Sequence, residues 1–355
     1  MPDNQVEEDG ILSEFTVIAK GKTEKVNFPK HEILNPIMMT CTDRIIALSN
    51  IFKPTHLSVY DYRDSSFMGH FLNAGRGNSE VSIMTTLKTQ GEELYFWDLN
   101  KRQLSTVRTN NLGHISNSVS FVKANEHIFK VYRINDDMSL GTGPFKGHPF
   151  AIMDNKADSI TTLFGIYPLA EDENLNDTQK AYACQWNCHY EPERKKMAAA
   201  TTCGSFIAFY ELKELNKPAL VCRKGNILPK FAKAKGGSVK FLPQNTYGFI
   251  DVAGNAHYCV ALYWGKRYDD YPQDIFGGDM LLIYDWNGNP IKAIKLNSIY
   301  RAITVTPDSD TILLVRKNER TGEFMVEKLC LLTSHQVQRY NSNMNFNIEI
   351  RKYAY

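Results

Sequence analysis

The chain has 355 residues, 43% apolar and 12% aromatic, so it has enough apolar material for a large core and is not a disordered or low-complexity protein. Forty-one Lys and Arg oppose 39 Asp and Glu, and a formal charge of +2 is too small for a general attraction to nucleic acid or anionic lipid. No Pro-, Ser- or Gly-rich linker divides the sequence. We therefore expect one domain over residues 1–355, with residues 1–10 as a disordered tail.

The cysteines and the apolar runs bear on the compartment. Seven scattered cysteines are an odd number in a chain too large to need cross-linking, so a disulfide framework is not expected. No run of 18 apolar residues occurs, so no transmembrane segment is expected. The acidic, polar start lacks the regions of a signal peptide, so either the protein stays in the cytoplasm or the sequence begins after a removed export signal.

Along the chain, short apolar runs rich in Val, Ile, Tyr and Phe alternate with turn residues, as in strands. One pattern recurs: an apolar run with an acidic residue near its end, a polar turn, and a second apolar run. Its clear copies are residues 57–62 with 67–71, 94–99 with 104–107, 207–212 with 219–221, and 282–286 with 291–294. Each copy predicts a hairpin, most plainly at Asn287-Gly288, and the acidic residue is expected to accept hydrogen bonds from the turn backbone.

Further strands precede each hairpin, as at residues 37–40 and 44–48, and complete units of four. Repeated four-stranded antiparallel units predict an all-β fold, a six-bladed β-propeller. The blades are expected near residues 36–72, 82–122, 126–168, 180–224, 245–296 and 299–331, and the third shows the pattern least clearly. The sixth lacks a strand, and residues 14–19 are expected to complete it, so that an N-terminal strand closes the ring.

Two segments resemble the TolB-like six-bladed β-propeller proteins of the bacterial envelope. Gly75-Arg76-Gly77-Asn78-Ser79-Glu80 is similar to the Gly-Arg-Gly-Pro-Gly-Glu turn of that family, with Asn78 and Ser79 in place of Pro and Gly. Residues 282–290 and 303–305 are similar to its late-blade pattern. The resemblance implies export to the periplasm or cell envelope, often as a lipoprotein anchored through a removed N-terminal lipid signal. It implies a binding role and supplies no catalytic residues.

Aromatic and basic residues lie together in three stretches that we expect at the mouth of the axial channel. Trp and Tyr beside Arg or Lys suit carbohydrate, peptide or anionic ligands, through stacking and charge-assisted hydrogen bonds. For any single residue, packing between blades is the commoner explanation. The candidate ligand-binding residues are Arg76, Trp186, His189, Tyr190, Trp264, Lys266 and Arg267. The expected partner is a protein, a carbohydrate or a peptide, and not nucleic acid.

A metal site at Cys184, Cys188 and His189 is not expected. Strand spacing points the two cysteines to one face and His189 to the other, and no second Cys/His pair is nearby. Neither a Gly-x-Ser-x-Gly elbow nor a Walker loop is present.

The alternative function is a metal-dependent, lactonase-like hydrolase with a cation on the propeller axis. Glu80, Asp154 and Asp251 are candidate ligands for that cation. The preferred interpretation is a binding or protein-interaction module without catalysis or cofactor, because no spacing singles out a converging set of acids.

Overall fold

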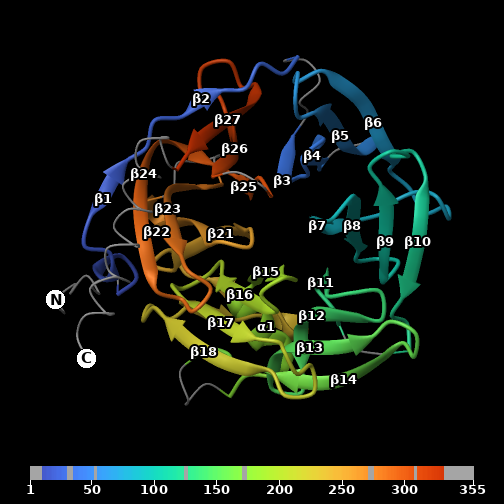
Figure 1. Ribbon diagram of the computed structural model, residues 1–355. Coiled ribbons are helices and arrows are strands. Elements are labelled where there is room, and N and C mark those ends of the chain that lie inside the picture. Colours follow the sequence, from blue (N-terminus) through green and yellow to red (C-terminus); the bar gives the residue numbers. More distant parts are fainter. Residues whose placement is uncertain are drawn as a thin grey trace, which may run out of the picture.

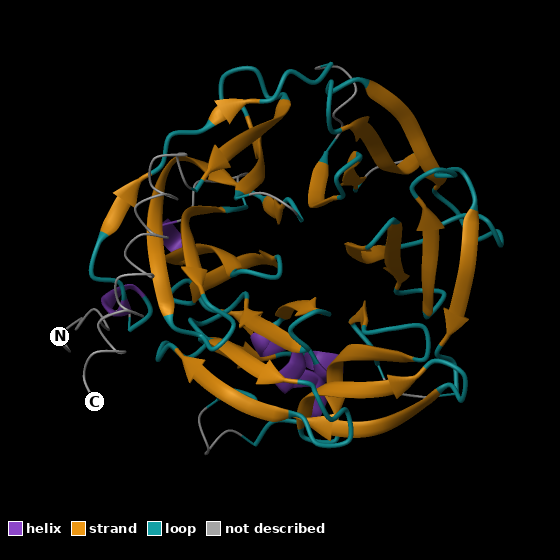
Figure 2. Cartoon of the chain, viewed as in Figure 1, coloured by secondary structure: helices purple, strands orange, loops and turns teal. Residues whose placement is uncertain are grey.

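The computed structural model describes residues 10–29, 35–51, 54–123, 127–169, 174–270, 276–307 and 310–331. Most of their strands form six blades of four antiparallel strands, arranged in a ring around a central channel (Figures 1 and 2). The first strand of each sheet lies at the channel and its last strand at the outside. The predicted all-β fold, a six-bladed propeller of four-stranded blades, is confirmed. The predicted tail lies outside the described residues, apart from Gly10.

Blades one to three follow one another along the chain, each strand pairing with the next. From the channel outwards, blade one consists of β3 (Pro36–Cys41), β4 (Ile45–Asn50), β5 (Thr55–Asp61) and β6 (Phe67–Asn73). Blade two consists of β7 (Met84–Gln90), β8 (Glu93–Asp98), β9 (Gln103–Arg108) and β10 (Ile115–Ser120). Blade three consists of β11 (Lys130–Arg133), β12 (Met138–Phe145), β13 (His148–Asp154) and β14 (Ser159–Phe164). The third blade is as regular as the others. Its acid-ended strand is β13, where Asp154 accepts hydrogen bonds from the next turn.

Blades four to six continue the same order. Blade four consists of β15 (Trp186–Glu191), β16 (Lys196–Thr201), β17 (Ile207–Glu211) and β18 (Ala219–Lys224). Blade five consists of β21 (Thr246–Gly254), β22 (Cys259–Arg267), β23 (Gly278–Tyr284) and β24 (Pro290–Tyr300). Blade six begins with β25 (Ala302–Val305), β26 (Thr311–Lys317) and β27 (Phe324–Cys330). The expected limits therefore agree with the blades to within a few residues.

The ring is closed by N-terminal residues, although by a different segment from the one expected. β2 (Glu24–Lys25) pairs antiparallel with β27 and becomes the fourth strand of blade six. Residues 14–19 do not take that position, and this part of the prediction is wrong. β1 (Ile18–Lys20) instead pairs in parallel with β24, the outer strand of blade five. The N-terminal segment therefore pairs first with blade five, through β1, and then with blade six, through β2. The Thr23 hydroxyl donates to the Glu327 carboxylate at 2.7 Å beside the closing pair.

The core lies between the blades. The hydrophobic clusters of the described residues each join two adjacent blades, and together they follow the whole ring. Strand β8 shows the cause, because side chains along a strand alternate between its two faces. Leu94 and Phe96 pack toward blade one, while Tyr95 and Trp97 pack toward blade three. Its uninterrupted apolar run reflects burial on both faces.

The links between blades hold structure that the sequence did not predict. α1 (Asp177–Cys184) precedes β15, where residues 180–185 were expected to begin blade four. Asn176 caps this helix by accepting from the Gln179 backbone at 2.9 Å. A hairpin of β19 (Phe231–Lys233) and β20 (Val239–Phe241) follows blade four. The 3-10 turns lie at Leu12–Glu14, Lys235–Gly237 and Tyr268–Asp270. No helix in the described ranges is long and apolar enough to cross a membrane.

The acidic residues of the repeated pattern hold turns. Asp98 accepts from the backbone N–H groups of Ser82 and Asn100, at 2.7 and 3.1 Å. Asp285 accepts from the N–H of Asn287 at 2.8 Å. The next residue, Gly288, has a φ of +82° and leaves no room for a Cβ atom, which would lie 2.3 Å from the Cys222 sulfur.

Candidate functional site

The axial channel is lined by the inner strands β3, β7, β11, β15, β21 and β25 (Figure 1). Polar side chains bond each inner strand to the next blade. Thr89 Oγ1 contacts Thr40 Oγ1 at 3.0 Å, and Asn187 Nδ2 donates to the Ile250 carbonyl at 3.2 Å. These bonds fix the inner strands against one another, so the channel wall is preorganised.

One side chain crosses the channel and divides it. Lys88 lies on β7 of blade two, and Asp251 lies on β21 of blade five, on the opposite side of the ring. The Lys88 ammonium donates to the Val252 carbonyl at 2.9 Å and lies 3.7 Å from Asp251 Oδ1. Both side chains are largely buried, with 15% and 19% of their surface exposed. The bridge leaves a cavity on either side of it.

The larger cavity, which we name the acidic cup, has a volume of about 530 Å³. It is formed where the inner strands end in their first turns. Its lining residues are 40–43, 88–92, 189–193, 253–256, 304–305 and 307, and they come from five blades. Four carboxylates and one ammonium line it, which gives a formal charge of −3 with His189 neutral. Two of the candidate residues, His189 and Tyr190, belong to this cup.

The smaller cavity, which we name the basic cup, has a volume of about 310 Å³ and lies at the start of the inner strands. Its lining residues are 37–39, 84–88, 130, 132, 185, 187–188, 202, 250–251 and 276. Lys88, Lys130 and Asp251 are its charged residues, with a formal charge of +1. The two cups on one axis therefore carry opposite charge.

His189 lies against the wall of the acidic cup. Its ring stacks on Trp286, with 5.9 Å between ring centroids, and 18% of its side chain is exposed. Nε2 lies 4.0 Å from a Glu191 carboxylate oxygen, beyond hydrogen-bonding distance. Burial lowers the pKa of His189; Glu191 opposes this shift, and the positive charge of Lys88 adds to it. The ring is therefore held neutral at physiological pH.

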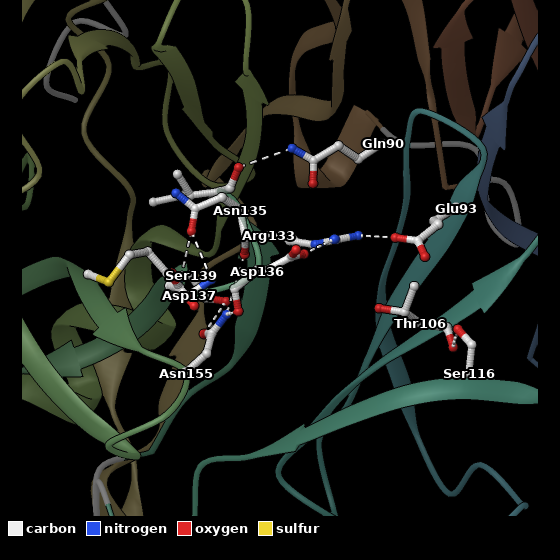
Figure 3. A network of polar contacts seen from close by, with 12 residues as sticks. Gln90, Glu93, Thr106, Ser116, Arg133, Asn135, Asp136, Asp137, Ser139 and Asn155 are labelled. Carbon is white, nitrogen blue, oxygen red and sulfur yellow. Dashed lines mark hydrogen bonds and ion pairs between the residues drawn. The ribbon is translucent and has the colours of Figure 1, made fainter.

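The rim of the acidic cup is tied to blade three by an ionic network (Figure 3). Arg133 on β11 contacts Glu93 on β8 at 2.5 Å and also pairs with Asp136. Gln90, which lines the cup, donates from Nε2 to the Ile134 carbonyl at 3.0 Å. These contacts join blade three to blade two, which contributes Gln90 to the lining of the cup.

Trp186 does not line either cup. Its indole is 4% exposed and packs edge-on against Phe150, with ring centroids 5.1 Å apart, in the core between blades three and four. Packing between blades, which is the commoner explanation for a single aromatic residue, therefore accounts for the burial of Trp186.

Trp264, Lys266 and Arg267 lie together at the end of β22, away from the lining of both cups. Trp264 is 5% exposed in the core between blades five and six, and the Lys266 ammonium lies 4.1 Å from its ring centroid. Lys266 also pairs with Asp279 at 3.4 Å, and Arg267 pairs with Asp269 at 2.8 Å. Part of the following loop, residues 271–275, lies outside the described residues.

Arg76 is exposed in the turn that links blades one and two. The turn is held by Glu80, whose carboxylate accepts from the Gly77 N–H at 2.7 Å, and by Lys101, which donates to the Gly77 and Glu80 carbonyls. The seven candidate residues are therefore not brought into one site. His189 and Tyr190 share a cup, and the other five lie elsewhere.

The acids considered for a catalytic cation lie in three different environments. Glu80 holds the turn just described, and Asp154 Oδ1 accepts from the Lys156 and Ala157 N–H groups at 2.8 Å. Asp251 lies in the channel. No cluster of three or more His, Cys, Asp and Glu suited to a metal occurs in the part of the chain that is described. At Cys188, burial raises the thiol pKa to about 12, so the residue packs as a neutral group.

Sequence reasoning missed Lys88 and Lys130 and weighed Asp251 only as a hydrolase residue. One signal was present: the inner strand 84–90 carries Thr and Lys in place of the apolar run typical of blade interiors.

A model of the TolB-like 6-blade propeller-like family matches residues 14–308. The fold is similar to that of a Bacteroides fragilis protein that carries the name of an exported protein, with a TM-score of 0.54 and 8% identity over 87% of this chain and 94% of that one. It is also similar to a member of the duf4221 family from Bacteroides vulgatus, with a TM-score of 0.52 and 9% identity over 88% and 98%. At these identities the likeness concerns the fold alone. No curated protein matches the sequence. Because the family model spans most of the chain, the protein belongs to the TolB-like 6-blade propeller-like family.

Proposed function

We propose that this protein is a non-catalytic binding propeller of the bacterial cell envelope that holds a partner segment in the acidic cup. The observation that carries the proposal is the construction of the cup. Its lining comes from five blades, and its floor is closed by Lys88. A rigid, concave wall that carries convergent polar side chains suits recognition of an inserted side chain.

The charge of the cup favours a ligand with a positive group. Asp43, Glu92, Glu191 and Glu193 line it, and the single cation, Lys88, already contacts Val252 and Asp251. Tyr190 supplies an aromatic face beside these acids. A basic peptide segment therefore fits the cup better than the anionic ligands first considered, and better than an uncharged carbohydrate.

The envelope location rests on the family and on a structural neighbour that is named as exported. Fractionation of cells that express the full-length gene product tests this part of the proposal. Recovery with the periplasm or the membranes supports it, and recovery with the cytosol contradicts it.

Binding is tested with immobilised peptides and fluorescence anisotropy. We expect the protein to prefer Lys- and Arg-containing peptides over acidic peptides and neutral oligosaccharides, and Tyr190→Ala to weaken that binding about tenfold, equivalent to ~1.4 kcal/mol. Tyr268→Ala is the matched control, since Tyr268 is an exposed tyrosine outside the cup.

Three results contradict the proposal. The first is equal binding of basic and acidic peptides, and the second is an unchanged affinity in Tyr190→Ala. The third is turnover of a lactone or ester panel that requires added Ca²⁺ or Zn²⁺, which would establish the hydrolase alternative.

A further inference from the structure

The basic cup places two lysines beside each other in the interior of the channel. Lys88 on β7 and Lys130 on β11 belong to adjacent blades, and both line this cavity. A lysine in the interior is unfavourable unless its charge is compensated. The charge on Lys88 is compensated by Asp251. Lys130 has no carboxylate of its own among its described contacts.

Lys130 has unused hydrogen-bond donors. Its ammonium carries three N–H groups, and its single hydrogen bond within the described residues is to Asn187 Oδ1. Burial lowers the pKa of Lys130, whereas an anion beside the ammonium would favour the charged form. Asp251 makes no ion pair with Lys130 among the described residues: its carboxylate oxygens accept from the N–H groups of Val252 at 2.8 Å and Ile303 at 3.0 Å, and its charge favours the Lys130 ammonium only from a longer distance.

Two hydroxyl groups in the lining add to this donor set. Thr86 is 3% exposed, and its Oγ1 has no hydrogen-bond partner among the described residues. The Tyr132 hydroxyl accepts from the Cys188 N–H at 3.0 Å, which leaves its own O–H to donate. A buried hydroxyl without a partner is costly unless a ligand or water satisfies it. Ammonium and hydroxyl donors together fit an oxyanion.

Much of the remaining wall is apolar, although Thr85, Gln185, Asn187 and Thr202 also line it. Met38, Met84 and Ile250 line the cavity, along with Ile37 and Phe276, which are 40% and 43% exposed. The cup therefore combines two lysines with a largely apolar wall and matches a molecule that has an anionic head and an apolar body.

We propose that the basic cup binds a small monocarboxylate with an apolar body, whose carboxylate contacts Lys130, Lys88 and Thr86. The formal charge of +1 matches one negative charge and leaves no surplus for a phosphate dianion. The cavity of about 310 Å³ limits the ligand to a short aliphatic or aromatic acid. This site lies on the opposite side of the Lys88 bridge from the acidic cup and is independent of the peptide proposed there.

Isothermal titration calorimetry of the full chain with 4-methylpentanoate and 3-phenylpropionate tests the site. Each acid is compared with its neutral amide and with inorganic phosphate. We expect one of the acids to bind at least tenfold tighter than its amide and than phosphate. We also expect Lys130→Met to reduce its affinity at least tenfold, while Lys266→Met, which changes an exposed lysine outside the cup, leaves it unchanged.

Equal affinity for acid and amide overturns the proposal, as does tighter binding of phosphate, an unchanged affinity in Lys130→Met, or no binding of either acid at millimolar concentration. Thr86→Val removes the unpartnered hydroxyl with little change in volume and provides the decisive variant if Lys130→Met does not fold. Binding of basic peptides, measured on the same samples, separates failure here from failure of the proposed function.

Discussion

The two cups of the channel share the same inner strands, yet their linings differ in charge and in origin. The acidic cup lies where strands pass into turns, and part of its acidity follows from turn chemistry. Glu191, for example, accepts from the Glu193 N–H at 3.2 Å. The basic cup is lined mainly by residues within the inner strands, where no turn backbone has to be held. Lys88 donates to the Val252 carbonyl across the channel, whereas Lys130 has no hydrogen bond to a backbone group among the described residues.

This difference affects how each lining is interpreted. A carboxylate in a turn has a structural reason to be there, so the acidic cup is recognised by its shape and total charge. A buried lysine with spare donors lacks such a reason, so Lys130 is the more specific indicator of a ligand. The bridge between Lys88 and Asp251 keeps the two environments apart, and the predictions below test that separation.

The largest effect is expected from Asp251→Ala. This change removes the acceptor for the Val252 and Ile303 N–H groups and leaves Lys88 without its carboxylate. The free energy of unfolding should fall by about 2–3 kcal/mol in urea denaturation. Asp43→Ala, which removes an exposed carboxylate from the acidic cup, should change it by less than about 0.5 kcal/mol. An equal fall in the free energy of unfolding in the two variants would show that the bridge between Lys88 and Asp251 contributes no more to stability than an exposed carboxylate of the acidic cup.

A smaller effect is expected from His189 as the pH falls. Its pKa is lowered in the folded protein, so below the ordinary value of about 6.5 the unfolded chain binds a proton that the native ring does not. His189 therefore lowers stability as the pH drops through 6.5, by at most about 1.4 kcal/mol per pH unit. Unfolding measured between pH 7.5 and pH 5 should depend less steeply on pH in His189→Gln. The exposed His114→Gln should keep the steep dependence, and parallel curves for wild type and His189→Gln would contradict the assignment.

The smallest effect is expected outside both cups. Lys266 is 45% exposed where it pairs with Asp279 and covers Trp264. Lys266→Ala should lower the free energy of unfolding by less than about 1 kcal/mol, because exposed ion pairs and cation–π contacts contribute little. It should leave the affinities for basic peptides and for carboxylates unchanged. A loss of either affinity would indicate that the surface around Lys266 takes part in binding, and ligand binding could then no longer be assigned to the two cups alone.

Much of the ring could be predicted from the sequence because each blade is buried on both faces. The run 94–97 is apolar at every position since alternate residues enter two different inter-blade cores. Acid-ended strands marked the turns. The closing strand could not be predicted as easily: Glu24–Lys25 is two residues long and carries no apolar signal. The α1 helix is short and depends on its Asn176 cap and on packing against blade three.

The site was less predictable for a geometric reason. Lys88 meets Val252, which lies 164 residues away, only because a six-membered ring places blade two opposite blade five. Aromatic and basic residues clustered in sequence, such as Trp264 and Lys266, were easier to notice, but that cluster packs against blade six. His189 and Tyr190 lie at the channel because they are on the first strand of a blade, and their role in ligand binding stays a prediction.

The closing strand also sets the order in which the ring can be finished. Thr23 and Glu327, which meet beside β2 and β27, are 304 residues apart. During synthesis, blades one to five leave the ribosome before β27 exists, so β2 has to wait for almost the whole described chain before it can pair. A chain released early would leave an unpaired strand at the gap, and such edges readily join other chains. The pairing of the N-terminal strand β2 with β27, the last described strand, can therefore form only in a chain that has been translated through β27.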